Sequence, residues 1–276
     1  MSPDHSSDQS PLGQTVSYEA DYDPTLLFAI PRRDGRERLG LYGALPFSGC
    51  DIWNAYELSW LNARGKPVVA WGEFWVPASS PNIIESKSFK LYLNSLNQQR
   101  FENLEAVTHT LRRDLSACAG AEIGVELHLP EQWSQFPLSQ PAGLCLDGLD
   151  VAITAYTPQP ELLQIQSSEI VSRQLYSRLL RSRCPVTGQP DWGAISVAYT
   201  GPEIDPAGLL AYIVSFRQHQ DFHEQCVERV FCDIQQRCAP QSLTVFARYL
   251  RRDGLDINPY RSTDQARPLN SRLFQQ

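Results

Sequence analysis

The chain has 276 residues, 42% hydrophobic and 20% charged, enough to build one large or two medium-sized cores. Its net charge of −7 and pI near 5.3 argue against a surface for duplex nucleic acid, so we expect no direct nucleic-acid binding. No apolar run approaches the roughly 20 residues that span a bilayer, which excludes a membrane-spanning helix.

The N-terminal segment is polar and lacks the charged-then-apolar pattern of a secretion signal. We predict that residues 1–40 form a partly disordered lead-in and that the protein is cytoplasmic. The seven cysteines are an odd number and contain no CxxC pair, so a disulfide framework is not expected.

The first third of the chain predicts two strands, at residues 53–61 and 68–76. A helix is expected where apolar residues recur at helical spacing, ending near Gly120, and residues 123–127 then alternate as a half-buried strand.

Between these elements lies the hexamer Glu85–Lys90, in which Glu85 precedes a serine that we expect to cap a helix. A carboxylate can bind the N–H edge of a purine-like base. Serine, lysine and free amides at a helix start can bind phosphate. The alternative is a solvated, capped helix start with no ligand.

The chain repeats itself. Residues 91–96 match 211–216 at an offset of 120, and residues 147–151 recur as 253–257. Two α+β modules with antiparallel sheets and helices on one face are therefore predicted, at 41–156 and 157–276. We expect the closing strand of the first module within residues 130–160 and the boundary in the polar run near 157–169.

The second module predicts a strand at 194–199, a helix with a buried stripe from Cys226 to Cys238, and an alternating strand at 243–249. The two copies differ in their polar residues, which suggests one composite site formed between the modules. Independent drift of the two copies is the alternative.

Cys184 follows Arg183 in a Pro/Gly-rich stretch that predicts a loop. An adjacent cation favours the thiolate, which is a strong nucleophile, and Asp191 could fold back as a proton donor. An inert cysteine, with Asp191 simply starting a strand, is the competing interpretation.

Two further polar groups are candidates. His223 and Glu224 open a predicted helix, where they could bind a base edge or simply complement the helix dipole. Arg252, next to Asp253, could hold a phosphate or be an ordinary surface arginine. No GxGxxG or Walker loop is present, so a Rossmann or P-loop site is not supported.

Four segments together resemble the QueF family, the NADPH-dependent nitrile reductases of queuosine biosynthesis, in its long two-module form. The likeness covers roughly residues 20–265, and its segments are 85–90, 184–191, 221–224 and 254–259. The resemblance implies an α+β tunnelling fold (T-fold), as in GTP cyclohydrolase I, and a homodimer.

The resemblance also implies the reaction. Cys184 would attack the nitrile carbon of 7-cyano-7-deazaguanine to form a covalent thioimide, with Asp191 as proton donor. Two NADPH per turnover would reduce it to the aminomethyl product, and no metal would be needed.

The site residues implied by the resemblance fall into two sets. Substrate would contact Ile84, Glu85, Ser86, His223 and Glu224. NADPH would contact Ser86, Lys87, Arg252 and Asp253. The chain departs from the family pattern at Asp253, where relatives carry glycine, so the cofactor could meet either its backbone or its side chain.

Two other functions remain open. One is a zinc-dependent cyclohydrolase or pterin-type enzyme on the same fold, which needs a Cys/His ligand set. The other is a purine-binding module without catalysis, which would tolerate loss of Cys184.

Overall fold

The computed structural model describes residues 21–276, which form two compact units. Each unit is assembled from segments that are separated in the sequence. The described part of unit 1 comprises residues 21–35, Asp51–Pro137 and Arg251–Asp256. Unit 2 comprises Arg36–Cys50, Leu138–Leu250 and Ile257–Gln276. The module boundaries 41–156 and 157–276 refer to the sequence repeat and stay a prediction.

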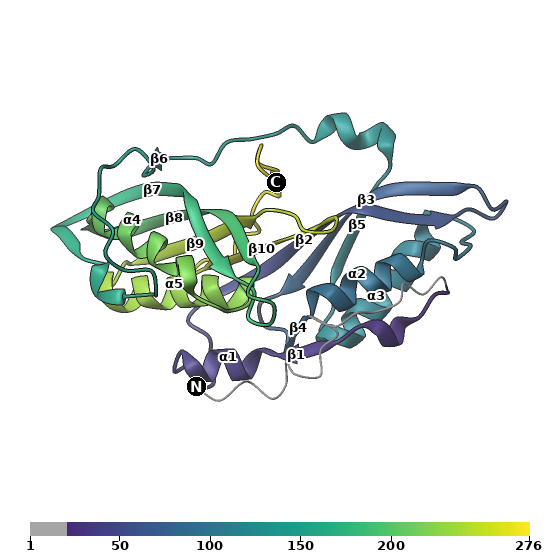
Figure 1. Ribbon diagram of the computed structural model, residues 1–276, viewed down its shortest axis with the longest axis horizontal. Coiled ribbons are helices and arrows are strands. Elements are labelled where there is room, and N and C mark those ends of the chain that lie inside the picture. Colours follow the sequence, from purple (N-terminus) through teal and green to yellow (C-terminus); the bar gives the residue numbers. More distant parts are fainter. Residues whose placement is uncertain (1–20) are drawn as a thin grey trace. The chain divides into compact units, whose positions relative to one another are not determined.

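Within unit 1 the strand order is β5-β3-β2, and helices α2 and α3 pack along these strands (Figure 1). Its strands are β2 (Ser48–Leu61, in this unit from Asp51), β3 (Pro67–Pro77) and β5 (Gly124–His128). Strands β1 (Ala29–Pro31) and β4 (Asn82–Ile84) form a separate antiparallel pair. The helices are η1 (Pro24–Leu26), α2 (Ser86–Ser95), α3 (Leu104–Ala119) and η2 (Pro130–Gln135).

Within unit 2 the strand order is β10-β9-β8-β7-β6, with α4 and α5 along one face of these strands (Figure 1). Its strands are β6 (Leu144–Cys145), β7 (Ile165–Arg183), β8 (Pro190–Ile204), β9 (Ser242–Tyr249) and β10 (Leu255–Ser262, in this unit from Ile257). Its helices are η3 (Pro160–Leu162), α4 (Pro206–Ser215), η4 (Phe216–Gln218) and α5 (His223–Cys238). A short helix, α1 (Arg32–Arg38), contributes residues to both units. The α+β class with helices on one face is therefore confirmed.

The internal repeat is visible in the hydrogen bonds of the two units. In unit 1 the Tyr92 hydroxyl donates to Asp114, on the neighbouring helix, at 2.7 Å. In unit 2 the Tyr212 hydroxyl donates to Asp233 at 2.6 Å, again from the first helix to the second. Burial raises the pKa of both tyrosines, and the facing carboxylates add to the effect, so both hydroxyls stay protonated donors.

The hexamer helix α2 is anchored by its aromatic residue. Phe89 is fully buried, with its ring centroid 5.2 Å from that of Trp53 on β2 and 5.1 Å from that of Phe74 on β3. Such ring pairs, together with the buried apolar area, stabilise the docking of α2 on the sheet. The polar residues of the hexamer are thereby held in a fixed position relative to strands β2 and β3.

One expectation about the middle of the chain was wrong. Within residues 130–160, where the closing strand of the first module was expected, the structure has the short strand β6, which pairs in parallel with β7 of unit 2. The polar run at 157–169 includes the start of β7, a 19-residue strand, and the module boundary expected there stays a prediction. Five prolines between 130 and 160 remove backbone donors and oppose a ladder there, whereas β7 pairs along its length with β8.

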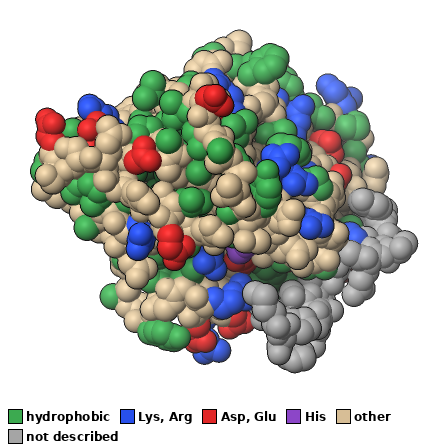
Figure 2. Space-filling model, turned by 60° about the vertical axis from the view of Figure 1, so that its left-hand side comes forward, with side chains coloured by type: hydrophobic (Ala, Val, Ile, Leu, Met, Phe, Trp, Pro, Cys, Tyr) green, Lys and Arg blue, Asp and Glu red, His purple; other side chains and the backbone are tan. Residues whose placement is uncertain are grey.

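Part of the lead-in is ordered. Residues 21–40 include η1, β1 and α1, while residues 1–20 of the expected lead-in lie outside the described range. On the face drawn in Figure 2, positive and negative side chains are interspersed. Within residues 21–276, no helix is long and apolar enough to cross a membrane.

Candidate active site

Cys184 sits at the first position of the loop between β7 and β8, as expected from the sequence. Its amide donates to the Gln189 carbonyl at 2.9 Å and its carbonyl accepts from Gly188 at 3.0 Å, so the loop is tightly closed. The Thr187 amide points at the Cys184 sulfur, at 3.5 Å. The residue is 5% exposed. An N–H aimed at sulfur stabilises negative charge that develops there.

Asp191 lies on the returning strand of the same hairpin. The β7–β8 register pairs it with Ser182, two residues before Cys184, so the chain does fold back as expected. Asp191 is 5% exposed, and its Oδ2 is 3.5 Å from His223 Nε2. The hairpin therefore places a thiol in its loop and a carboxyl on its returning strand, with an imidazole at the carboxyl.

His223 opens helix α5 and is held by an aromatic stack. Its ring lies 3.9 Å from the Tyr249 ring, centroid to centroid, at an interplanar angle of 28°. Among residues 21–276, its Nε2 makes no hydrogen bond, although it is buried from solvent. A buried polar atom that is held in place and makes no hydrogen bond can accept or donate one to a ligand.

The first turn of α5 adds two more buried groups. Glu224 is 3% exposed. Cys226 begins the expected apolar stripe, which ends at Cys238, and both cysteines are buried. Burial, and secondarily the Asp221 carboxylate, raises the pKa of the Cys226 thiol well above its ordinary value. Cys226 therefore stays a protonated core residue, which leaves Cys184 as the candidate nucleophile of this hairpin.

A second loop braces the Cys184 hairpin. The Arg183 amide donates to the His219 carbonyl at 2.8 Å, and the Asp221 amide donates to the Arg183 carbonyl at 3.3 Å. Arg38, the last residue of α1, approaches Asp221 at 3.3 Å. Sequence reasoning missed Arg38 because it lies far from the motif and carries no local signal. Its contact contributes to the position of the loop that opens α5.

The hexamer differs from the expectation in one respect. Glu85, and not Ser86, caps helix α2: its two carboxylate oxygens accept from the amides of Lys87 and Ser88, each at 2.8 Å. Asp205 caps α4 of unit 2 in the same way. Two amides expected to be free for phosphate are therefore occupied, and Glu85, 1% exposed, would offer a ligand its remaining lone pairs.

The structure brings the turn at Arg252 and Asp253 next to the hexamer helix, within unit 1. Lys90 Nζ lies 3.2 Å from Asp253 Oδ2. Ser86, Lys87 and Lys90 lie within two turns of α2, so the hydroxyl and the two ammonium groups lie near one another, with Arg252 on the adjacent turn. This is a set of groups that suits an anionic ligand.

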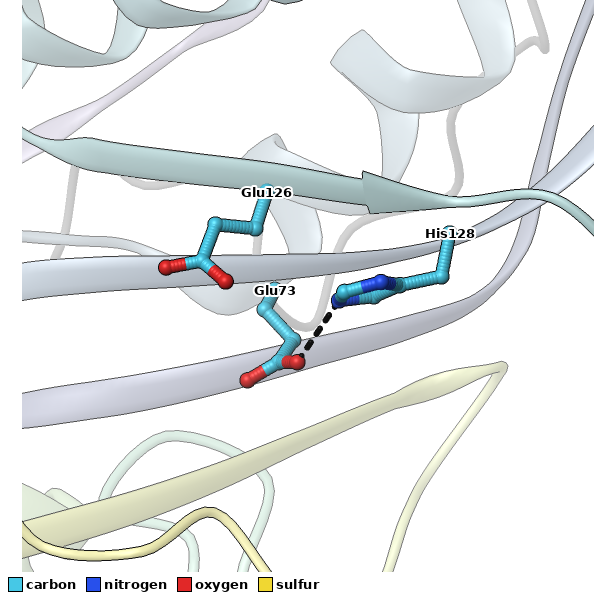
Figure 3. Close-up of side chains that lie close together, drawn as sticks. All are labelled: Glu73, Glu126 and His128. Carbon is cyan, nitrogen blue, oxygen red and sulfur yellow. Dashed lines mark hydrogen bonds and ion pairs between the residues drawn. The ribbon is translucent and has the colours of Figure 1, made fainter. Parts of the chain in front are cut away.

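The described residues offer few ligands for the zinc-dependent alternative. Among residues 21–276, one group has metal-like spacing: Glu73, Glu126 and His128, on β3 and β5 (Figure 3). It contains no cysteine, and His128 Nε2 is hydrogen-bonded to Glu73 at 2.8 Å. The His128 ring also packs on Trp71, at 4.8 Å between centroids. One imidazole with two carboxylates is not the Cys/His set of a zinc cyclohydrolase.

Chelation provides the corresponding prediction. Dialysis against EDTA is expected to leave the nitrile-dependent NADPH oxidation implied by the family resemblance within about twofold of the untreated protein, since that chemistry uses a thiol. The measurement is absorbance loss at saturating substrate, with metal content followed by mass spectrometry. Activity that disappears and returns with zinc would contradict the thiol chemistry and favour the cyclohydrolase-type alternative.

Comparison with known proteins decides the family. Residues 18–127 match a family described as nitrile reductase, 7-cyano-7-deazaguanine-reductase N-term, and residues 190–268 match one described as QueF-like protein. The chain belongs to the QueF family. The first QueF match contains Glu85, Ser86 and Lys87, and the second contains Asp191, His223, Glu224, Arg252 and Asp253.

Individual QueF relatives are similar over nearly their whole length. Each of the following is named NADPH-dependent 7-cyano-7-deazaguanine reductase. The Burkholderia ambifaria protein is 56% identical over 278 residues, covering 100% of both chains. The Bordetella avium protein is 57% identical over 253 residues, which cover 92% of this chain and 93% of the relative. The Chromobacterium violaceum protein is 55% identical over 265 residues, which cover 96% of this chain and 95% of the relative. The QueF resemblance inferred from motifs is confirmed.

Proposed function

We propose that this protein is an oxidoreductase that reduces the nitrile of 7-cyano-7-deazaguanine to the aminomethyl group, with NADPH as reductant. The observation that carries the proposal is the β7–β8 hairpin of a QueF-family chain. It presents Cys184 and Asp191, both buried, with His223 Nε2 at 3.5 Å from the carboxyl. A nucleophile, a proton carrier and an orienting imidazole are what covalent nitrile activation requires.

The first chemical step belongs to the chain itself. The Cys184 sulfur forms a bond to the nitrile carbon, one π bond of the nitrile breaks, and the nitrogen takes up a proton from Asp191. The product is a thioimide on Cys184. Covalent attachment divides a hard reduction into easier steps, because a free nitrile is a poor hydride acceptor. The Thr187 amide supports the anionic sulfur before attack and after its release.

Base recognition is proposed for Ile84, Glu85, Ser86, His223 and Glu224. Glu85 and Glu224 are buried carboxylates, each able to accept from N–H groups of a deazaguanine. His223 Nε2 is a further polar atom for the same edge, and Ile84 and Ser86 supply contacts at the start of α2. Burial strengthens such bonds and penalises a ligand that lacks the matching donors.

Cofactor binding is proposed for Ser86, Lys87, Arg252 and Asp253. The Lys90–Asp253 contact supports it, since it joins the helix and the turn that carry these residues. NADPH, when bound, supplies a hydride, and two are needed because a nitrile gains four electrons on becoming an amine. The residues would hold phosphate by charge and hydrogen bonds. We further propose a place in queuosine biosynthesis, and a homodimer.

One experiment tests substrate, cofactor and nucleophile together. The protein is mixed with 7-cyano-7-deazaguanine, and intact mass is expected to increase by the mass of the nitrile, with the adduct mapping to the Cys184 peptide. Addition of NADPH is expected to consume two equivalents per nitrile and to release the adduct. No adduct and no NADPH oxidation would refute the proposal.

Replacing Asp191 by asparagine is expected to slow turnover by about 10²–10⁴, because asparagine fills the space but cannot pass a proton. The nitrile is still expected to bind, within about threefold of wild type, as measured by equilibrium titration. Steady-state NADPH oxidation gives the rate. Unchanged turnover would remove Asp191 from the mechanism, and loss of binding would assign it to recognition.

A further inference from the structure

The turn that carries Arg252 is a tight hairpin with an acidic residue at its tip. The Arg252 amide donates to the Leu255 carbonyl at 2.8 Å, and the Leu255 amide donates back at 3.1 Å. Asp253 and Gly254, between them, both have positive φ, of 49° and 77°. This is the two-residue turn for which Asp-Gly, Asn-Gly and Gly-Gly are the favoured sequences. The backbone therefore accepts aspartate, asparagine or glycine at position 253.

The side chain at this tip faces a cation of the hexamer. Asp253 is 81% exposed, whereas its partner Lys90 is 17% exposed, with 3.2 Å between carboxylate and ammonium. Lys90 lies three residues after Lys87 on α2, so the two ammonium groups share a side of the helix. The Asp253 carboxylate thus lies at Lys90, on the side of α2 that also carries Lys87, a residue proposed to hold the cofactor.

We propose that the Asp253 carboxylate is an internal counter-ion: it occupies Lys90 in the free enzyme and is displaced when an anionic group of the dinucleotide binds. The inference rests on the proposed cofactor role of this region. In this proposal the side chain of Asp253 weakens NADPH binding, and only the backbone of Asp253 contacts the cofactor. Asp253 then lowers the affinity for NADPH and speeds the release of the oxidised cofactor.

The strength of the contact fits such a role. An ion pair with one strongly exposed partner is weak, because water and salt screen it. A phosphate carries more charge than one carboxylate and several acceptor oxygens, so it can replace Asp253 at Lys90. A displaced carboxylate close to that phosphate then repels it, which lowers the affinity further.

The test uses two substitutions that preserve the turn. Asp253→Asn keeps the size of the side chain and removes its charge, and Asp253→Gly removes the side chain at a positive φ where glycine is unstrained. NADPH affinity is measured by fluorescence titration without nitrile, and KM and kcat by NADPH oxidation. Both variants are expected to bind NADPH on the order of threefold to tenfold more tightly, with most of the change in KM.

Lys90→Gln supplies the matched background. It is expected to weaken NADPH binding, and in this background Asp253→Asn is expected to improve the affinity by less than about twofold, since its partner is gone. Thermal unfolding of each variant checks that the turn is intact.

The outcomes separate the two proposals. If Lys87→Gln and Arg252→Gln weaken NADPH binding while both Asp253 variants bind as wild type or worse, the counter-ion role is wrong and the cofactor site stands. If none of the Lys87, Lys90 and Arg252 variants changes NADPH binding, the cofactor site is wrong and the counter-ion role fails with it. Tighter binding by both Asp253 variants supports the inference.

Discussion

Cys184→Ala is expected to lower nitrile-dependent NADPH oxidation by at least about 10⁴, because it removes the atom that forms the covalent bond. The mass increase with nitrile alone is expected to vanish, while equilibrium binding of the nitrile persists, since the recognition groups of the site remain. Intact mass, titration and absorbance measure the three quantities on one preparation.

Cys232→Ala is the matched control. Cys232 is a half-buried thiol of α5 in the same unit, and burial, followed by the nearby Glu228 and Asp233 carboxylates, raises its pKa to about 12. It therefore stays protonated near neutral pH, and its loss is expected to leave the adduct intact. A Cys184→Ala protein that still oxidises NADPH with nitrile present would refute the mechanism. A wild-type protein that binds the nitrile but forms no adduct and oxidises no NADPH would instead favour a binding module.

Glu228→Ala is expected to destabilise unit 2 by about 3–5 kcal/mol, the range for removing one partner of a buried ion pair. Glu228 on α5 is 3% exposed in its side chain and accepts from Arg36 and from Arg261, with shortest distances of 2.8 and 2.9 Å. Arg261 is fully buried and Arg36 nearly so. Losing the carboxylate leaves two buried guanidinium groups without their shared counter-charge.

The measurement is urea unfolding followed by circular dichroism, with Glu203→Gln as control. Glu203 pairs with Arg173 at 3.1 Å, but both side chains are partly exposed, so a loss of at most about 1 kcal/mol is expected. Domains are typically stable by 5–15 kcal/mol, so the Glu228 variant loses a large share of that stability. Equal effects of the two substitutions would contradict the importance assigned to burial.

The hexamer shows where sequence reasoning reached its limit. Serine is a favoured N-cap, so the sequence pointed to Ser86. The structure selects Glu85 because β4 leads directly into the helix: Ile84 pairs with Ala29 of β1, and the Glu85 amide donates to the Phe28 carbonyl at 2.9 Å. This contact with a segment almost sixty residues earlier holds Glu85 in the extended conformation of a cap, from which its longer side chain reaches two amides.

Strand β7 illustrates the same limit for the fold. Its first ten residues are mostly exposed and polar, so no alternation of apolar residues marks a strand. They form one because β8 supplies hydrogen bonds along the register, a non-local contribution that single-sequence periodicity does not contain. The helices α3 and α5, in contrast, were predicted at their observed positions because their buried faces follow local helical spacing.

The sequence by itself determined the α+β class, the repeat, the loop position of Cys184 and the family, because these depend on local periodicity and on motifs. The tertiary structure decided what surrounds those motifs. It moved the cap of the hexamer helix to Glu85, joined Lys90 to Asp253, and gave His223 its aromatic stack and Asp191 its imidazole. Each of these contacts joins residues that are distant in the chain or depends on such a contact, and burial and register set them.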